Sequence, residues 1–353
     1  MNCGECNIAA VAEVAEKARC NRDNLKGLSN PILDKWKVFK PIGEYVEDEQ
    51  AKRMVFHVRS FPLFIQAIGS VKYNCTRNEN GQDSGTRIVY RGQDFLMPSN
   101  VPFQPSSYRK RDGRYPKQAK VDISINSAVK LLQKYSENMR NLDKRVVEGV
   151  LQHYGQESRW IDAVDNIWTA LWFSCHKAWK GNKNGSYVHY ERRNPYLESA
   201  THPYCYILLL GVETLAMDDC ASPGLMGNSR YEILDLRYAI PSYYIRPHVQ
   251  HGVLVRSLDS KGHPNFDMSN LVRSVIRIDL KNALDWLGDG GSFKPGSMFP
   301  APAFDTGFDE LLRTETAMKE RECELLRKTK ITASDKKELG VLGKYKLLLQ
   351  TIC

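Results

Sequence analysis

The chain has 353 residues, of which 42% are hydrophobic and 26% charged, so it is long enough for one large globular domain with appendages or for two domains. It has no run of about 18 apolar residues, which argues against a membrane span, and no basic region followed by an apolar core near its start, which argues against a secretory signal. Fifty Lys and Arg against 41 Asp and Glu give a formal charge of +9, a balance that favours polyanionic partners. Nine scattered cysteines indicate reduced thiols, so we expect a cytoplasmic protein.

Residues 1–53 are predicted to form a helical or extended lead. Within it, Cys3 and Cys6 have the spacing of half a zinc site. No second Cys or His pair lies nearby in the sequence, so two free thiols are favoured and we expect no metal. A strand at 55–58 follows, and then a helix that Ser60 and Pro62 open.

The next strand, at 87–90, runs directly into Arg91 and Gly92. An arginine at a strand end offers a two-pronged donor to a phosphate or carboxylate, and a glycine beside it lets a ligand approach the backbone. The alternative is an arginine that forms a surface salt bridge in a turn. A loop at 108–120 then mixes basic and aromatic side chains, which is typical of segments that contact phosphates and stacked bases, although a solvated loop has the same composition. Its candidate contact residues are Arg109, Lys110, Arg111, Arg114 and Tyr115.

Residues 127–154 predict one long or two consecutive amphipathic helices, which Gly155 would close with a positive φ. A short buried strand at 160–162 follows, and Asn166 is placed to cap a helix whose buried face would be Ala170, Leu171 and Phe173. His153, Arg159 and Asp162 would therefore lie at element ends, where polar side chains can line a cleft.

Further strands are predicted at 204–212, 231–236 and 272–280, and another that Gln250, His251 and Gly252 lead into. A helix is expected at 283–287, and residues 316–353 form a charged helical tail that either docks a partner or is a solvated hairpin. The elements together predict an α+β fold with a mixed or antiparallel central sheet flanked by helices.

Four motifs resemble the FRG domain, a family named for an aromatic-Arg-Gly signature, across about 60–315. The first is Tyr90-Arg91-Gly92-Gln93, and the second is Pro105-Ser106-Ser107-Tyr108-Arg109. The third joins Gln152-His153-Tyr154-Gly155 to Ser158-Arg159-Trp160-Ile161-Asp162, Asn166 and Ala170-Leu171-Trp172-Phe173-Ser174. The last is Arg246, Gln250 and Gly252, with Phe299-Pro300 further on. Ala163-Val164 departs from the Trp-Thr of the family, and Ile167 replaces a proline. We assign residues 54–315 to this domain.

The order of these motifs is also similar to the layout of ADP-ribosyltransferases, which use NAD as a substrate. That resemblance implies that Tyr90, Arg91, Gly92, Gln93, Arg159 and Asn166 contact NAD, and that Arg91, His153, Asp162 and Gln250 are the catalytic set. The implied protein is an effector in a toxin or phage-defence setting that modifies a nucleic-acid or protein acceptor. Gln250 is not a carboxylate, however, and Ala163-Val164 lacks the expected hydroxyl. A sensor that binds nucleotide or nucleic acid in the same cleft without turnover is therefore the alternative. A metal hydrolase has no supporting His or Cys pattern.

Overall fold

The computed structural model describes residues 44–77, 83–110, 113–180, 187–198, 202–214, 218–219, 222–288, 293–328, 330–342 and 350–352. Most of the predicted lead, with Cys3 and Cys6, lies outside these residues, as do Arg111 and residues 343–349 of the tail. None of the described helices is long and apolar enough to cross a bilayer.

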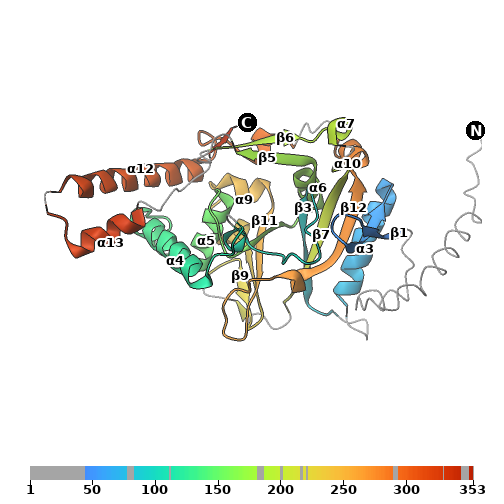
Figure 1. The fold of residues 1–353 in the computed structure, drawn as a ribbon, viewed down its shortest axis with the longest axis horizontal. Coiled ribbons are helices and arrows are strands. Elements are labelled where there is room, and N and C mark those ends of the chain that lie inside the picture. The colour runs from blue at the N-terminus through green and yellow to red at the C-terminus, as the bar shows by residue number, and fades with distance from the viewer. Residues whose placement is uncertain are drawn as a thin grey trace, which may run out of the picture.

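A ten-stranded mixed sheet forms the centre of the molecule (Figure 1). The strands, in spatial order, are β1 (Glu44–Asp48), β2 (Arg53–Val58), β12 (Val272–Asp279), β7 (Tyr204–Glu213), β3 (Thr86–Gln93), β4 (Ile161–Val164), β11 (Gly252–Ser257), β10 (Tyr231–Asp235), β9 (Leu225–Gly227) and β8 (Asp218–Asp219). Every pairing is antiparallel except that of β12 with β2. A second sheet has the order β13 (Gln350–Ile352), β6 (Tyr187–Arg192) and β5 (His176–Lys180). The predicted α+β class is confirmed.

Helices cover one face of the sheet near its centre. These are α3 (Phe61–Cys75), α6 (Ile167–Cys175) and α10 (Leu280–Leu287). Their apolar side chains pack in one core with alternate residues of β3, β7 and β12, including Ile88, Leu209 and Ile276. The side chains on the other face of these strands, such as Val89 and Leu208, pack against the 96–103 segment and the short 3-10 helix η3 (Ser269–Leu271). Because successive side chains of a strand point to opposite faces of the sheet, each of these strands contributes to both cores.

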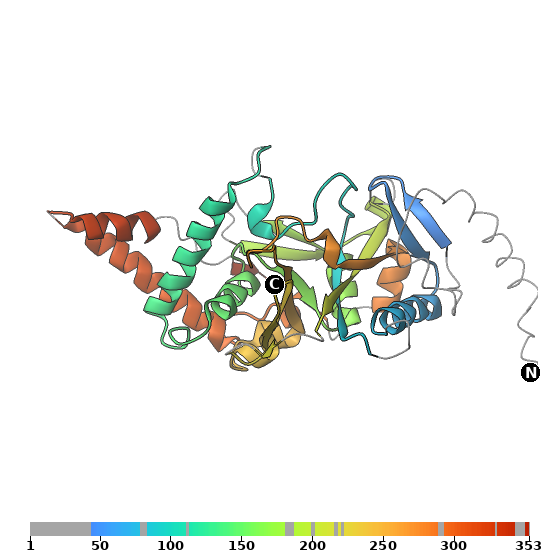
Figure 2. The same ribbon diagram turned by 90° about the horizontal axis from the view of Figure 1, so that it is seen from below.

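A helical layer occupies one end of the molecule. It contains α4 (Gln118–Tyr135), α5 (Lys144–His153), α8 (Leu236–Ala239), α12 (Thr306–Arg327) and α13 (Ala333–Leu342), which share a third core. Figures 1 and 2 show α4, α12 and α13 together at the end opposite β1 and α3. The expected boundary at 315/316 falls inside α12. Three short elements complete the chain: α7 (Pro195–Glu198), α9 (Ile245–Val249) and α11 (Pro295–Met298), with the 3-10 helix η2 (Ser106–Tyr108) before α4.

Several predicted boundaries were wrong. Arg91 and Gly92 lie inside β3, because β7 continues opposite them as far as Tyr206. Asp162 is the second residue of β4 instead of its last, because β11 pairs with β4 up to Val164. The end of the predicted 108–120 loop already belongs to α4, and Gln350 is in a strand instead of a helix.

The prediction for α6 was largely right. The Asn166 side chain caps it by accepting hydrogen bonds from the backbone N–H of Trp168 and of Thr169. Ala170 and Leu171 are fully buried, but Trp172 replaces Phe173 on the buried face because the small β5–β6 sheet covers that side. Gly155 has the expected positive φ, 100°.

Candidate functional site

Strands β3 and β4 meet at a single residue pair, Tyr90 with Val164, and then separate. Arg91 lies where they separate, and its Nη1 donates a hydrogen bond to the backbone carbonyl of Asp162 at 2.5 Å. Its Nε is buried and has no hydrogen-bond partner among the described residues. Burial lowers the pKa of Arg91 to about 10, although the Asp162 carboxylate counteracts the shift, so the guanidinium stays charged at neutral pH. The sheet therefore holds a half-buried cation whose Nε has no partner among the described residues.

His153, the last residue of α5, faces the same carboxylate. Its Nε2 is 3.4 Å from Oδ1 of Asp162, without hydrogen-bond geometry, and neither ring nitrogen has a partner in the described part of the chain. The His153 side chain is almost fully buried, whereas that of Asp162 is 40% exposed. Burial lowers the pKa of His153 more than Asp162 raises it, and the charge of Arg246 lowers it further. The imidazole is thus neutral at pH 7 and beside an accessible acid.

The second and third sequence motifs are joined by one glutamine. Oε1 of Gln152 accepts hydrogen bonds from the Ser158 hydroxyl at 2.5 Å and from the Ser106 hydroxyl at 3.5 Å. The Ser106 hydroxyl also accepts from the backbone N–H of Ser158 at 3.1 Å. This triangle fixes the start of η2 against the segment before β4. As a result Arg109, three residues after Ser106, lies close enough for the Asp162 charge to act on its pKa, which desolvation lowers.

Both motif glycines provide room for neighbouring protein atoms. A Cβ on Gly92 would lie 1.8 Å from the backbone oxygen of Ala170 in α6. We expected Gly92 to admit a ligand to the backbone, but α6 occupies that space, so its role in the fold is close packing of strand and helix. A Cβ on Gly252 would lie 2.4 Å from Cε1 of His153, so this glycine leaves space for the imidazole ring.

The closing motif is anchored by contacts away from Asp162. Gln250 is buried, and its Nε2 donates to the backbone carbonyl of Met298 at 2.7 Å. Arg246 is buried with its Cζ 4.1 Å from the centre of the Phe308 ring and 4.9 Å from that of Tyr154. The Gln250 amide is thus bound to the main chain of α11 and does not contact Asp162 in the structure. Gly252, two residues later, lies against the His153 ring.

Tyr190 in β6 is a member of this group that sequence reasoning missed. Its ring stacks on Phe299 with centroids 4.2 Å apart. Burial raises its pKa, and the charges of Asp162, Arg246 and Arg91 also act on it. Tyr190 follows a segment rich in Lys, Asn and Gly, and the sequence offers only an aromatic residue close to two arginines as a signal. Tyr190 and Phe299 thus place aromatic rings near the charges of Asp162, Arg246 and Arg91.

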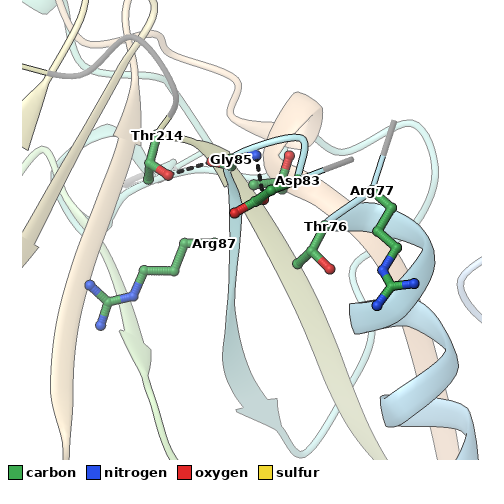
Figure 3. Close-up of a pocket in the computed structure, with 7 residues that line it drawn as sticks. Thr76, Arg77, Asp83, Gly85, Arg87 and Thr214 are labelled. Atoms are coloured by element: carbon green, nitrogen blue, oxygen red, sulfur yellow. Dashed lines mark hydrogen bonds between the residues drawn. The ribbon is translucent and has the colours of Figure 1, made fainter. Parts of the chain in front are cut away.

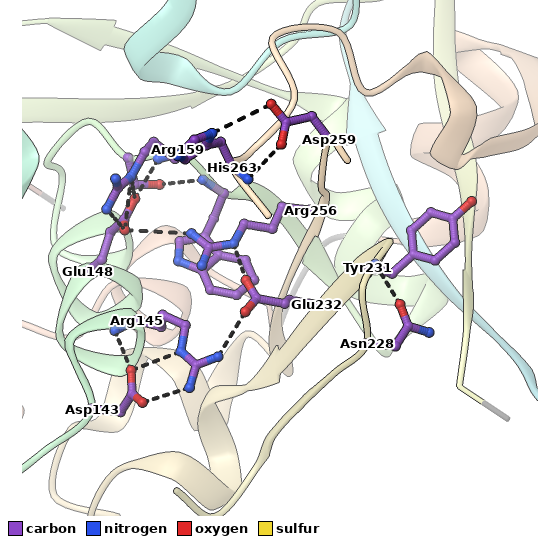
Figure 4. A network of polar contacts seen from close by, with 12 residues as sticks. Asp143, Arg145, Glu148, Arg159, Asn228, Tyr231, Glu232, Arg256, Asp259 and His263 are labelled. Atoms are coloured by element: carbon purple, nitrogen blue, oxygen red, sulfur yellow. Dashed lines mark hydrogen bonds and ion pairs between the residues drawn. The ribbon is translucent and has the colours of Figure 1, made fainter. Parts of the chain in front are cut away.

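Other predicted NAD contacts have roles in the fold. Tyr90 is buried in the core beneath α6, and Asn166 caps that helix. Arg159 is held in a network of charges (Figure 4), with its Nη2 2.7 Å from Glu148 and its Nη1 3.0 Å from Asp122. The network continues through Arg256 to Glu232 and Arg145. Oε1 of Gln93 is buried and lacks a hydrogen-bond partner among the described residues.

An open pocket of about 540 Å³ lies elsewhere, beyond the opposite end of β3 (Figure 3). Arg77 and Arg87 are among the residues that line it. The Arg87 guanidinium is paired with Asp235 at 3.0 Å and with Asp165 at 3.3 Å, and Figure 3 shows it pointing away from Arg77. Three residues of β3 lie between Arg87 and Arg91, so this pocket is distinct from the site at Asp162.

Comparison with known families agrees with the motif geometry. Residues 86–183 match the model of the FRG domain. The chain contains an FRG domain. The matched segment runs from the start of β3 through α6 and includes Arg91, His153 and Asp162. Comparisons with curated proteins and with solved structures gave no significant match.

The buried histidines of the FRG domain should make its stability depend on pH. Burial lowers the pKa of His153, and lowers that of His176, which stacks on Trp172, to about 4. A group with a lowered folded-state pKa binds more protons when unfolded, so its contribution is complete above about pH 6.5 and declines as the pH falls below that value. We expect the free energy of unfolding to drop between pH 6.5 and 5, and His153→Gln to flatten that decline. Urea unfolding at each pH measures it. His263→Gln, at an exposed position, is the control, and an unchanged slope in His153→Gln would contradict the assignment.

Proposed function

We propose that the FRG domain binds NAD at the Arg91 and Asp162 site and transfers its ADP-ribosyl group to an acceptor. The observation that carries this proposal is the convergence of Arg91, His153 and Asp162, which belong to β3, to the end of α5 and to β4. Arg109 and Tyr190 lie within electrostatic reach of the same carboxylate. A buried charge without a full set of partners is costly, so such an arrangement is typical of a binding site.

The donors of this site fit a dinucleotide. The Arg91 guanidinium would hold a phosphate in the two-pronged manner that arginine favours once its side chain turns the buried Nε toward the ligand. Tyr190 supplies an aromatic edge, and the exposed carboxylate of Asp162 can accept hydrogen bonds from hydroxyl groups of a ribose. One exposed carboxylate beside these donors suits a ligand that carries both phosphates and a cationic ring.

The reaction needs positioning and charge stabilisation more than covalent help. The glycosidic bond between C1′ of the ribose and the nicotinamide nitrogen breaks, and its electron pair stays on that nitrogen, which becomes neutral. Asp162 stabilises the developing ribosyl cation. The acceptor then forms a bond to C1′, and the proton that it loses passes to neutral His153, whose charge Asp162 would offset.

A second candidate is nucleotide binding without turnover. It is favoured by Gln250, since the motif position that would supply a carboxylate holds an amide bound to the Met298 carbonyl. In that case Arg91 and Arg109 would bind phosphate, and the protein would act as a sensor.

One experiment with the full chain distinguishes ADP-ribosyl transfer from nucleotide binding without turnover. NAD binding is measured by calorimetry, and label transfer from radioactive NAD is measured with mixed protein, DNA and RNA acceptors. We expect Arg91→Ala to weaken NAD binding by at least about tenfold, because a charge-assisted pair contributes roughly 1.5–3 kcal/mol. We expect Asp162→Asn to retain binding and to lower transfer by about a hundredfold or more.

Gln250→Glu is a companion variant that places a carboxylate in the closing motif, and it also removes the hydrogen bond that the amide donates to the Met298 carbonyl. Thermal unfolding of each variant shows whether it is folded. Binding of NAD without transfer in the unmodified chain would replace the enzyme with the sensor. Absence of NAD binding would refute both the substrate and the mechanism.

A further inference from the structure

A surface beside the candidate site combines exposed basic and aromatic side chains. We call it the 109–117 surface, and it consists of Arg109, Lys110, Arg114, Tyr115, Lys117 and Phe266. Tyr115 is 39% exposed and Phe266 is 36% exposed, although both are large and apolar. Scattered single exposures need no explanation, but these two rings contact each other, with centroids 4.9 Å apart and planes at 80°.

The rings are held in place from beneath. Phe266 also contacts Tyr108, which is fully buried, with centroids 6.0 Å apart. Nε2 of Gln118 donates to the backbone carbonyl of Pro264 at 3.4 Å, which ties the start of α4 to the segment that carries Phe266. Nζ of Lys110 lies 4.8 Å from the centre of the Tyr115 ring. The result is a supported aromatic platform with a cation at its edge.

Two described acids near this surface, Asp122 and Asp267, make their contacts away from its cations. Asp122 pairs with Arg159 at 3.0 Å. Asp267 accepts hydrogen bonds from the backbone N–H of Phe103 and of Ser269. Arg109 connects the surface to the candidate site, since the Asp162 charge acts on it.

We propose that the 109–117 surface binds single-stranded nucleic acid. Bases stack on Tyr115 and Phe266, while phosphates lie against Lys110, Arg114 and Lys117. This combination of a basic track with exposed rings is how proteins bind single strands without reading their sequence. An acidic peptide would use the charges but not the faces of the rings. An anionic bilayer would use both, and the vesicle competition described below distinguishes it from a single strand. The strand passes Arg109 toward Asp162, so nucleic acid is the acceptor of the reaction, an assignment that rests on the function proposed above.

Binding is tested without NAD, so that its outcome is independent of transfer. Fluorescence anisotropy of labelled 12-nucleotide single-stranded DNA and RNA is measured with the full chain between 50 and 200 mM salt. We expect Tyr115→Ala to weaken binding about tenfold. Lys110→Ala with Arg114→Ala should lower the slope of log affinity against log salt by about 1.4.

Matched controls come from other surfaces. Tyr238→Ala removes an aromatic ring that is 71% exposed on α8, and Arg313→Ala with Lys319→Ala removes two exposed charges from α12. These variants should bind as the unmodified chain does. Equal losses in controls and test variants would overturn the proposal, as would a polyglutamate peptide or anionic vesicles that compete as well as the oligonucleotide. If the chain binds the oligonucleotide but does not bind NAD, the proposal that this surface binds nucleic acid stands, and the proposal that the nucleic acid is the acceptor fails.

Discussion

Gly92→Ala is expected to prevent stable folding of the FRG domain. The added Cβ would lie 1.8 Å from the oxygen of Ala170 and 2.8 Å from its carbonyl carbon, and both atoms belong to the backbone of α6. Neither β3 nor α6 can move freely, because β7 pairs with β3 along its whole length and α6 is buried beneath the small sheet. We expect a loss of more than about 4 kcal/mol in the free energy of unfolding, the range of severe overpacking.

Gly69→Ala is the matched control for this change. Gly69 lies in α3, and a Cβ there would meet nothing within 4 Å. Alanine is a better helix former, so this variant should be stabilised by roughly 0.5–1 kcal/mol. Soluble expression, circular dichroism and urea unfolding of both variants measure the difference. A Gly92→Ala protein that unfolds at the same urea concentration as Gly69→Ala would show that α6 does not pack against β3 as described.

Glu148→Gln is expected to have the second largest effect. Glu148 is 1% exposed and accepts hydrogen bonds from the backbone and guanidinium N–H groups of Arg159, while Arg256 Nη1 lies 3.7 Å away. The amide keeps the shape of the carboxylate, but it leaves two largely buried guanidinium groups with one negative charge fewer. Breaking a buried ion pair by changing one partner costs about 3–5 kcal/mol.

The loss should appear in urea unfolding at pH 7 and low salt. Glu320→Gln removes a carboxylate from the exposed side of α12 and should stay within about 0.5 kcal/mol of the unmodified chain. A loss below about 1 kcal/mol in Glu148→Gln would mean that the network in Figure 4 contributes little. Arg91 and Asp162 are not part of that network, so the folded fraction should keep whatever affinity for NAD the unmodified chain shows.

Local sequence patterns predicted most of the strands and the main helices. A continuous apolar stretch at 204–212 and alternation at 272–280 indicated the two central strands, because both faces of β7 and one face of β12 are buried. Asn166 and Gly155 are local signals, a cap and a left-handed turn, and both were confirmed. The motif order also gave the FRG domain. These features depend on residues near one another in the chain.

The parts that sequence patterns could not supply depend on contacts between distant segments. A glycine that faces a ligand and one that faces a helix backbone have the same sequence signal, and only the position of Ala170 distinguishes them for Gly92. Arg159 has the residue type of a phosphate ligand, but Glu148 and Asp122 use its donors. Tyr190 joins the site because β6 folds over α6, which no local pattern of residues 187–192 indicates.

The separation of β3 from β4 gives Arg91 a role in the stability of the sheet as well as a place in the candidate site. Where two strands separate, the backbone groups that would have joined them must find other partners. At Asp162 that partner is the side chain of Arg91. Loss of this arginine would therefore leave a main-chain oxygen unsatisfied where the strands separate, in addition to any effect on the proposed ligand binding. The structural role alone is a sufficient reason for a related protein to keep an arginine at this position. The presence of that arginine in a relative is therefore not evidence that the relative catalyses the same reaction.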